Sequence, residues 1–520
     1  MTVTKTAVVE PGTSPTWSVS ATGFVTQSGT ISNISASELL DIYLLGDTIT
    51  KDGAVKQIEA TTNATWILLT DGTLWGCGNN TYGQQGRGSS GSGTEVKTFT
   101  QRLTDVAKVK AAYNGYVTWA LKTDGTLWGC GSNDEGQQGS GTSGSGQKVI
   151  SFTQRLTGVK DIVSTMGTTW ALKTDGTLWG CGYNAWGQQS SNNTTTITTF
   201  TQRLTDVKNV FATYTTTWAL KTDGTLWGCG NNSYGQQGSG DTTNVTTFTQ
   251  RLTDVAQLSA STDTTWALKT DGTLWGCGKN NYGQQGISTS TAQVKTFTQR
   301  LTDVAQVSAS IDTTWALKTD GTLWGCGKNN YGQQGSGDTT DVTTFTQRLT
   351  DVSDMFVFEG NSDSTWALKT DGTLLGCGDN SQGQQGSGDT TNVKTFTQRL
   401  TDVSAGDNAC FSTWALKTDG TVWGCGYNYF AQQGSGDTTN VKTFTKRNPT
   451  TTGYNSATLT INPTPSDATV TIDQVATKTA DIRKGLTATW SVSKTGYTTQ
   501  TGTTDHLYAD TTLNITLESA

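Results

Sequence analysis

The residues with the most reactive chemistry in this 520-residue chain are nine cysteines, one histidine and a set of loop aspartates. Eight of the cysteines occupy the same position of a repeated segment: Cys77, Cys130, Cys181, Cys229, Cys277, Cys326, Cys377 and Cys425. Equivalent positions in successive repeats lie too far apart for a disulfide, whose Cα atoms are within about 7 Å of each other. The spacing therefore predicts small buried apolar groups, not disulfides or a metal site. Cys410 is an isolated ninth cysteine.

The other candidates for catalysis are sparse. His506 has no Ser or Cys motif around it. Four aspartates recur in Gly-Ser-Gly-Asp-Thr-Thr loops, where they could bind a cation, but no dense carboxylate cluster accompanies them: Asp241, Asp338, Asp389 and Asp437. The Gly-Ser strings at 87–93 and 139–146 lack the Lys-Ser/Thr of a phosphate-binding loop. The sequence predicts no catalytic residue, cofactor or metal.

Aromatic residues at one variable repeat position offer binding chemistry instead. The residue before each Gly-Gln-Gln-Gly turn, or its variant, is Tyr82, Glu135, Trp186, Tyr234, Tyr282, Tyr331, Gln382 or Phe430. A ring of aromatic side chains flanked by asparagines could stack on sugar rings. Alternatively, each aromatic ring clamps its own loop. We take the six aromatic residues as a candidate ligand-binding rim: Tyr82, Trp186, Tyr234, Tyr282, Tyr331 and Phe430.

The element that positions these residues is a segment repeated eight times, Thr-Trp-Ala-Leu-Lys-Thr-Asp-Gly-Thr-Leu-Trp-Gly-Cys-Gly with small changes. The copies are 48 to 53 residues apart, which indicates one supersecondary unit repeated along the chain. In the copy around Asp223, the Asp-Gly step between two apolar runs predicts a two-residue type I′ hairpin. Pairing outward from that turn sets Ala219 opposite Gly228 and Trp218 opposite Cys229.

This register predicts how neighbouring units pack. Trp218, Trp227 and Cys229 would share one bulky face, and Gly228 would lie on the small face. The two tryptophans of one unit would press on the small face of the next, so Gly228 could not be larger. We take Trp218, Trp227, Gly228 and Cys229 as the structural interface between units.

Two more strands complete the unit, an outer strand at 247–252 and a mixed strand at 253–260. Four strands per unit, repeated radially, describe a β-propeller. The strand at 443–447 is expected to close the ring beside the first unit.

The repeat TTWALKTDGTLWGCGNNSYGQQG resembles the RCC1-like (regulator of chromosome condensation) repeat, and the resemblance covers residues 46–449. It implies a propeller, which in this family most often has seven blades. Eight full hairpins favour eight blades over seven plus a stray unit. The family's best-known activity is nucleotide exchange on a small GTPase. This chain has no insertion like the wedge of such exchangers, and fold alone does not confer the activity.

The two ends of the chain are related to each other. Residues 3–30 and 476–503 align at an offset of 473, with 16 of 28 positions identical. Residues 453–520 resemble the PEGA-like or immunoglobulin-like β modules of bacterial surface and phage proteins. Residues 1–45 contain half of this module, and an open sheet edge recruits further strands. We therefore take 1–45 as a candidate attachment surface. The half module could instead be completed by residues 31–45 or the propeller, or need no completion.

Composition favours an all-β protein, a propeller with small β-sandwich-like end modules. Charged residues make up only 15% of the chain, and 18 tryptophans recur in register, so the chain is not disordered. The net charge of −7, with scattered Lys and Arg, argues against nucleic-acid binding. The N-terminal segment lacks an apolar core, so neither a signal peptide nor membrane insertion is expected.

These features predict a non-enzymatic bacteriophage virion component that is assembled in the host cytoplasm. An accessory fibre, a decoration protein or a host-adsorption protein would each fit. Its partners would be other virion proteins, copies of itself, or a host surface glycan or protein. The alternative is a bacterial RCC1-like scaffold or adhesin at the cell surface. A carbohydrate-active enzyme would need a cleft with paired carboxylates, which the sequence does not show.

Overall fold

The computed structural model describes residues 16–19, 27–30, 55–288, 291–357, 363–409, 411–447, 456–472, 475–476, 478–483, 489–503 and 511–518. The chain divides into two compact units, Met1–Pro449 and Thr450–Ala520. All the regular elements in the described ranges are β-strands. The predictions about Cys410, His506 and residues 31–45 lie outside these ranges.

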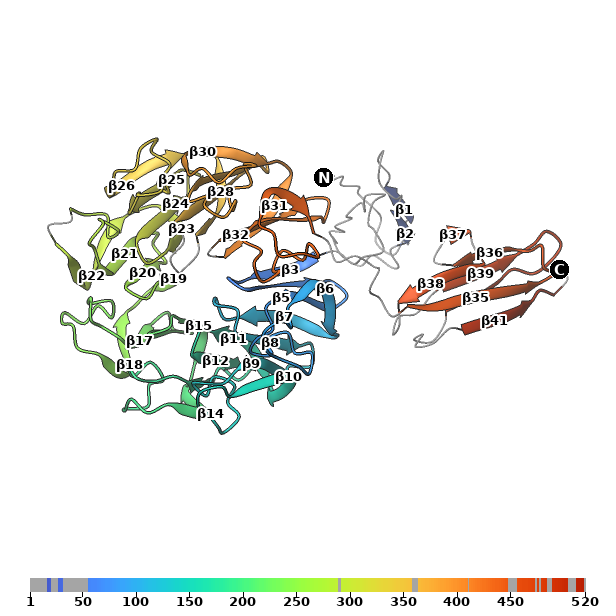
Figure 1. The fold of residues 1–520 in the computed structure, drawn as a ribbon, viewed down its shortest axis with the longest axis horizontal. Helices are drawn as coiled ribbons and strands as arrows, with labels where there is room; N and C mark the ends of the chain where they lie inside the picture. The colour runs from blue at the N-terminus through green and yellow to red at the C-terminus, as the bar shows by residue number, and fades with distance from the viewer. Residues whose placement is uncertain are drawn as a thin grey trace. The chain divides into compact units, whose positions relative to one another are not determined.

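Eight four-stranded antiparallel sheets, each built from consecutive strands, form a ring (Figure 1). This confirms the all-β, eight-bladed propeller. The first strands of the blades, which line the axis, are β3 (Val55–Ala60), β7 (Val106–Ala111), β11 (Val159–Ser164), β15 (Val207–Ala212), β19 (Val255–Ala260), β23 (Val304–Ala309), β27 (Val352–Val357) and β31 (Val403–Ala409). The second strands are β4 (Ala64–Leu69), β8 (Val117–Lys122), β12 (Thr168–Lys173), β16 (Thr216–Lys221), β20 (Thr264–Lys269), β24 (Thr313–Lys318), β28 (Ser364–Lys369) and β32 (Ser412–Lys417).

The third strands are β5 (Leu74–Gly78), β9 (Leu127–Ser132), β13 (Leu178–Gly182), β17 (Leu226–Gly230), β21 (Leu274–Lys279), β25 (Leu323–Gly327), β29 (Leu374–Gly378) and β33 (Val422–Gly426). The fourth strands are β6 (Val96–Leu103), β10 (Lys148–Leu156), β14 (Ile197–Leu204), β18 (Val245–Leu252), β22 (Gln293–Leu301), β26 (Val342–Leu349), β30 (Val393–Leu400) and β34 (Val441–Lys446). Blades are numbered here from the first (β3–β6) to the eighth (β31–β34).

The turn of the repeated hairpin differs from the prediction. In the fourth blade Leu220 pairs with Leu226 and Trp218 pairs with Gly228, so the loop has three residues instead of two. The amide of Gly224 donates to the carbonyl of Lys221, and Gly224 alone in this loop has a positive φ, +81°. This is a type I turn followed by a glycine in the left-handed region, the usual three-residue hairpin. The type I′ prediction was wrong because the turn needs only one positive φ, which glycine supplies.

The change of register reassigns the faces of each blade. Because Trp218 lies directly across from Gly228, the glycine makes room for the tryptophan of its own blade. A Cβ atom built on Gly228 would lie 2.4 Å from Trp218 Cζ3 and 2.5 Å from Gln237 Oε1. Trp227 pairs with Ala219 and points to the opposite face, where Lys221 Nζ lies 4.9 Å from the ring centroid. The predicted face shared by Trp218, Trp227 and Cys229 was therefore wrong.

Successive blades still stack through tryptophan. Trp218 is fully buried and packs in one cluster with Ala267 of the fifth blade. Its ring also meets Phe297 of the fifth blade edge-on, with centroids 6.0 Å apart. On the opposite face, buried Cys229 donates its thiol to the carbonyl of Gln188 in the third blade. Each blade thus buries a tryptophan against the next blade and a cysteine against the previous one.

The ring closes by blade packing and not through a shared strand. The strand expected to close it, β34, pairs with β33 inside the eighth blade, and the first blade supplies all four of its own strands. Trp414 of the eighth blade meets Phe99 of the first edge-on at 6.1 Å, as Trp218 meets Phe297. Cys77 likewise donates to the carbonyl of Gln432. A shared strand is unnecessary because the eighth interface repeats the contacts of the other seven.

The related ends fold alike. At the N-terminus, β1 (Thr16–Val19) pairs with β2 (Gln27–Thr30) so that Trp17 faces Gly29. The remaining strands are β35 (Ser456–Thr464), β36 (Thr469–Ile472), β37 (Val475–Ala476), β38 (Thr479–Arg483), β39 (Thr489–Ser493), β40 (Gln500–Thr503) and β41 (Thr511–Thr516). The pairing of β39 with β40 has the same register as β1 with β2, with Trp490 facing Gly502. In the residues that the structure describes, the duplicated segments therefore share one hairpin pairing.

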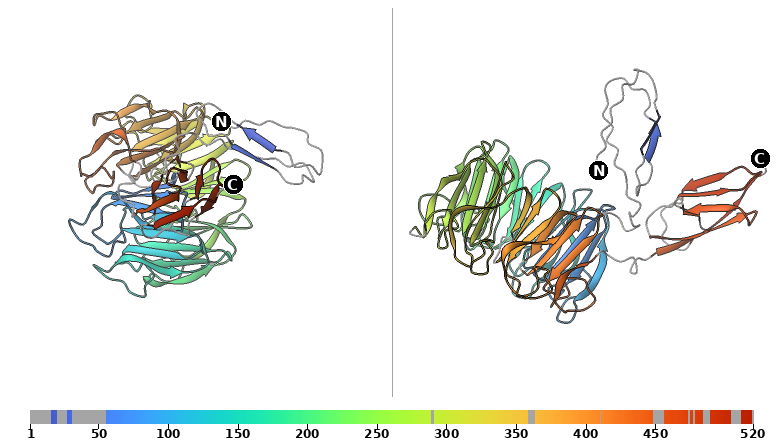
Figure 2. Two further views of the ribbon diagram at one scale, coloured as in Figure 1. Left: turned by 90° about the vertical axis from the view of Figure 1, so that its right-hand side faces the viewer. Right: turned by 90° about the horizontal axis from the view of Figure 1, so that it is seen from above.

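The C-terminal unit is a small sandwich (Figure 2). One sheet has the order β38-β35-β41 and the other β37-β36-β39-β40. Ile461 from the first sheet and Val470 and Val492 from the second are buried in one cluster, so the core lies between the sheets.

Candidate binding surface of the propeller

The loops that follow the third strands are fixed by a repeated amide network. In the fourth blade, Asn232 Oδ1 accepts from the backbone amide of Gln237 at 2.8 Å. Gln237 Nε2 donates to the carbonyl of Cys229 at 2.9 Å, and Gln236 Nε2 reaches the carbonyl of Thr262 in the fifth blade at 3.1 Å. The Gly-Gln-Gln-Gly turn therefore ties its loop both to its own blade and to the loop between the first two strands of the next blade.

The recurring loop aspartates belong to this network. Asp241 Oδ1 accepts from Ser239 Oγ at 2.8 Å, from the amide of Thr243 at 3.1 Å and from Asn232 Nδ2 at 3.1 Å. Hydrogen bonds from Ser239 and Thr243 lower the pKa of Asp241. In the parts of the chain that the structure describes, no three His, Cys, Asp or Glu side chains gather as a metal site would require. The hydrogen bonds of Asp241 are therefore made within its own loop, where they hold the loop conformation.

The rim aromatics lie in these loops, on one face of the ring that we call the loop face. The Tyr82 ring packs on Tyr116 of the second blade, with centroids 4.4 Å apart. Phe430 meets Tyr429 edge-on at 5.1 Å, and Trp186 is half-buried beside its turn. Tyr82 thus contacts a loop of the next blade, whereas Phe430 packs within its own loop.

Tyr234, Tyr282 and Tyr331 form a continuous arc with two lysines. Lys279 Nζ lies 5.8 Å from the ring centroids of both Tyr234 and Tyr282. Lys328 Nζ lies 5.9 Å from Tyr282 and 5.8 Å from Tyr331. The rim prediction thus named three tyrosines that the structure brings together, and missed the lysines between them.

Three aspartates complete this arc. Lys279 lies between Asp263 at 3.4 Å and Asp312 at 3.2 Å, and Lys328 lies between Asp312 at 3.7 Å and Asp363 at 3.3 Å. Burial alone would lower the pKa of Lys279, but Asp312 and Asp263 raise it overall. The alternating charges join the fifth, sixth and seventh blades. We call this row of Asp263, Lys279, Asp312, Lys328 and Asp363 the Lys279 and Lys328 ladder. The sequence contained a signal for it, because each lysine follows a Trp-Gly-Cys-Gly strand and each aspartate precedes a Thr-Trp strand.

The most exposed large apolar side chains also gather on the loop face. Among the described residues, four of the five exposed large hydrophobic side chains are tyrosines. Tyr234 (37% exposed), Tyr331 (38%) and Tyr429 (64%) lie in the loops after the third strands, and Tyr113 (41%) lies in the loop between β7 and β8. The fifth, Ile150, lies on outer strand β10. Sequence reasoning missed Tyr113 and Tyr429 because it considered only the position before the Gly-Gln-Gln-Gly turn. The loop face is therefore the aromatic surface of the propeller.

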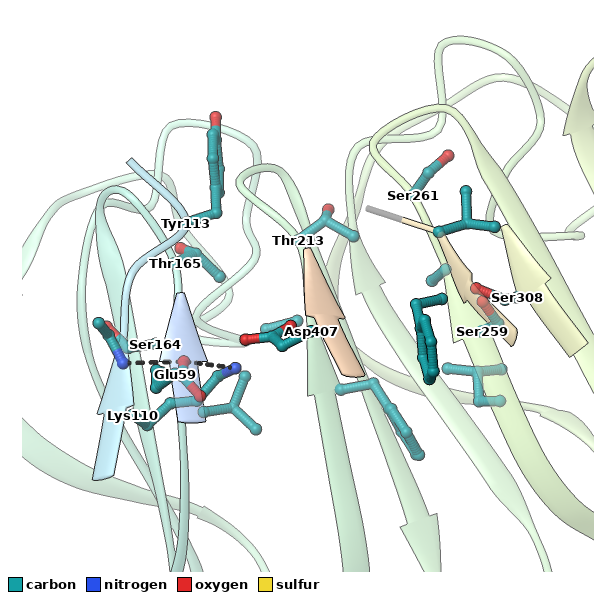
Figure 3. A pocket seen from close by; sticks show the side chains of 18 of the residues that line it. Glu59, Lys110, Tyr113, Ser164, Thr165, Thr213, Ser259, Ser261, Ser308 and Asp407 are labelled. Atoms are coloured by element: carbon teal, nitrogen blue, oxygen red, sulfur yellow. Dashed lines mark hydrogen bonds and ion pairs between the residues drawn. The ribbon is translucent and has the colours of Figure 1, made fainter. Parts of the chain in front are cut away.

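A cavity of about 870 Å³ lies on the axis, lined by the first strands of all eight blades. Figure 3 shows part of this lining. Its charges gather on β3, β7, β11 and β31. Lys110 pairs with Glu59 at 2.9 Å, and Lys108 pairs with Asp161. Asp407 Oδ2 accepts from the amide of Ala60 at 2.8 Å, across the ring closure. No sequence pattern indicated this cavity, because its lining residues differ from blade to blade.

Asp407 is the most perturbed carboxyl group of the cavity. Burial and the neighbouring Glu59 raise its pKa to about 7, while the Ala60 amide and Lys110 act in the opposite direction. The carboxyl group therefore titrates near neutral pH. It also links the first and eighth blades through its hydrogen bond with Ala60. Glu59, whose charge contributes to this shift, is itself paired with Lys110 and accepts from the amide of Ala111.

Comparisons with known proteins match the two units separately. Residues 38–353 match the RCC1-like domain, and residues 456–516 match the Head fiber dimeric protein-like domain. The C-terminal segment is 52% identical over 60 residues to the Head fiber dimeric protein of Bacteroides phage crAss001. That alignment covers 12% of this chain and 48% of the phage protein, so this chain spans about half the length of that relative.

Solved structures resemble the propeller. Prp20p from Saccharomyces cerevisiae gives a TM-score of 0.50 at 18% identity, over 65% of this chain and 89% of that one. Human WBSCR16 gives 0.48 at 18% identity, over 60% and 88%. At this identity the likeness to Prp20p shows the fold alone. The described residues contain no helix that is long and apolar enough to span a membrane.

Proposed function

The chain belongs to the RCC1-like domain family, and we propose that it is a non-enzymatic component of a bacteriophage head fibre. The observation that carries the proposal is the C-terminal match to a phage Head fiber dimeric protein at 52% identity. The propeller serves as a binding platform, and the C-terminal module joins the chain to the particle. We propose the corresponding division into residues 1–45, 46–449 and 453–520.

The C-terminal module is the proposed site of self-association. Its sandwich has its own core between two sheets and forms a compact unit apart from the propeller. The relative that it matches is named as dimeric. Residues 1–45 stay a second candidate for attachment, because β1 and β2 repeat the β39–β40 hairpin pair for pair.

Truncated chains test this assignment. Full-length protein, residues 1–449 and residues 46–520 are compared by light scattering after size-exclusion chromatography, and by incorporation into particles. We expect the full chain and 46–520 to be dimers and 1–449 to be a monomer that is not incorporated. Loss of incorporation in 46–520 alone would assign attachment to residues 1–45. A dimeric, normally incorporated 1–449 would contradict the role of the C-terminal module.

The loop face is the proposed surface for a host glycan. Exposed tyrosines from blades on both sides of the ring lie there, and the Lys279 and Lys328 ladder places charged hydrogen-bonding groups between them. An aromatic ring with polar neighbours offers a flat apolar face to a sugar ring and hydrogen bonds to its hydroxyls. This arrangement needs no catalytic residue.

A tyrosine pair provides the test of the glycan surface. We expect Tyr234→Ala with Tyr331→Ala to weaken binding to host cell-surface polysaccharide about tenfold, since each aromatic contact contributes about 0.5–1.5 kcal/mol. The corresponding phenylalanine variants should bind normally, and Ile150→Ala on the outer strand is the matched control. Equal binding by the alanine pair, or polysaccharide hydrolysis by the purified protein, would overturn the proposal.

A further inference from the structure

Eight arginines occupy equivalent positions, seven in the fourth strands and the last directly after β34: Arg102, Arg155, Arg203, Arg251, Arg300, Arg348, Arg399 and Arg447. The Nε atom of every one is enclosed and has no hydrogen-bond partner. The ion pairs between described residues all involve lysine, so no described carboxylate pairs directly with these guanidinium groups. The ring therefore carries eight half-buried cations at equivalent positions.

The eight arginines fall into three classes according to the charged loop residue that acts on them. In four blades, burial lowers the arginine pKa and a loop aspartate opposes that shift, as Asp241 does for Arg251. In three blades, burial lowers the pKa of Arg155, Arg203 and Arg300, and no aspartate opposes it. In the first blade, burial and a second arginine, Arg87, lower the pKa of Arg102 to about 10.

The first blade differs because of two loop positions. Its loop reads Gly-Arg-Gly-Ser where the fourth blade has Gly-Ser-Gly-Asp, so Arg87 replaces Ser239 and Ser89 replaces Asp241. The bridge to the next blade is kept, since Arg87 pairs with Ser151 as Ser239 pairs with Thr296. The loop has thus lost a carboxylate and gained a guanidinium whose charge acts on Arg102.

We propose that Arg87 and Arg102 form an oxyanion-binding site at the junction of the first and second blades, which takes a sulfate or phosphate group. Two planar guanidinium groups supply the forked donors that suit such an anion, and arginine remains charged when partly buried. Arg102 is half-buried and Arg87 is exposed, so the site combines an anchored donor with an accessible one. The overall charge of −7 repels anions, which makes a local site necessary for binding.

The eight arginines provide an internal control for an anomalous-scattering experiment. Crystals of the full chain soaked in selenate should show the strongest peak at Arg87 and Arg102. Weaker peaks are expected at Arg155, Arg203 and Arg300, and none at the four arginines that have a loop aspartate. Even peaks around the ring, or no peak at Arg87, would overturn the proposal.

A loop exchange tests the site in solution. Arg87→Ser with Ser89→Asp places the fourth-blade residues at these two exposed or half-buried positions, so the variant should fold and melt like the wild type in chloride. At constant ionic strength, sulfate, phosphate and glucose 6-phosphate should each raise the melting temperature of the wild type more than that of this variant. A response to glucose 6-phosphate assigns the site to phosphate esters as well as to the free ion. Identical melting-temperature shifts for both proteins would mean that the anions stabilise the protein only as general salts, and would contradict the proposed site.

Discussion

Gly228→Ala is the smallest change that tests how a blade is packed. The added Cβ would lie 2.4 Å from Trp218 Cζ3 and 2.5 Å from Gln237 Oε1, well inside van der Waals contact. Trp218 is fully buried between the fourth and fifth blades, so it has no space to move into. Gln237 is held at the same time by the carbonyl of Cys229 and the side chain of Asn232.

The expected cost follows from these contacts. Overpacking of a filled core destabilises by about 1–3 kcal/mol, and loss of the Gln237 bond to Cys229 adds about 1 kcal/mol. Chemical denaturation should therefore show a loss of about 2–4 kcal/mol for Gly228→Ala. Gly228→Val should lose more. Thr249→Val, at the exposed cross-strand neighbour of Gly228, and Asp241→Ala, in the loop, should both unfold close to the wild type.

A double-mutant cycle identifies which tryptophan the glycine accommodates. Trp218→Met opens space beside residue 228, so Gly228→Ala should cost little in that background, with a coupling energy of about 0.5–3 kcal/mol. Trp170→Met removes the equivalent tryptophan of the third blade and should show no coupling. Coupling to Trp170 instead of Trp218 would refute the reasoning, because the glycine would then accommodate a neighbouring blade.

Three other predictions concern the cavity, the cysteines and the tyrosine arc. The raised pKa of Asp407 means that the folded state holds this proton more tightly than the unfolded state, so its contribution favours folding at low pH and is lost as the pH rises from about 4 to about 7. Asp407→Asn should remove that part of the dependence, and urea titrations that give parallel wild-type and variant curves over this range would contradict it. Burial raises the pKa of the eight repeat thiols far above neutrality, so the native protein should react with Ellman's reagent at these positions only on unfolding; rapid native labelling, located by mass spectrometry, would disprove their burial. Lys279→Met should lower the melting temperature more than Lys221→Met, because Lys279 joins two blades whereas Lys221 only covers Trp227 within its own blade; equal losses would show that the ladder does not tie blades together.

Sequence periodicity was enough to predict the propeller, because eight copies of a Trp-rich hairpin cannot bury their surfaces except against each other. It did not determine the register of that hairpin. An Asp-Gly step is compatible with two-residue and three-residue loops, and the choice depends on Asp223 accepting from the amide and hydroxyl of Thr225. One extra loop residue moved Trp227 to the opposite face and changed the partner of Gly228.

The candidate site was predictable only where residues repeat. The rim tyrosines were found because they precede a recognisable turn. The Lys279 and Lys328 ladder was missed, since its members are far apart in sequence and meet only when blades are adjacent. The axial cavity was missed for a different reason, because Glu59, Lys110 and Asp407 share a position that is Val, Phe or Ser in the other five blades.

A cryo-EM reconstruction of the particle that carries this chain tests the central claim most directly. The account predicts ring-shaped densities of eight blades on fibres of the capsid, in pairs that are joined through the C-terminal modules. Deletion of residues 453–520 should remove these rings and leave the capsid intact. Propeller density on the tail, or its absence from the purified particle, would contradict a role in the head fibre.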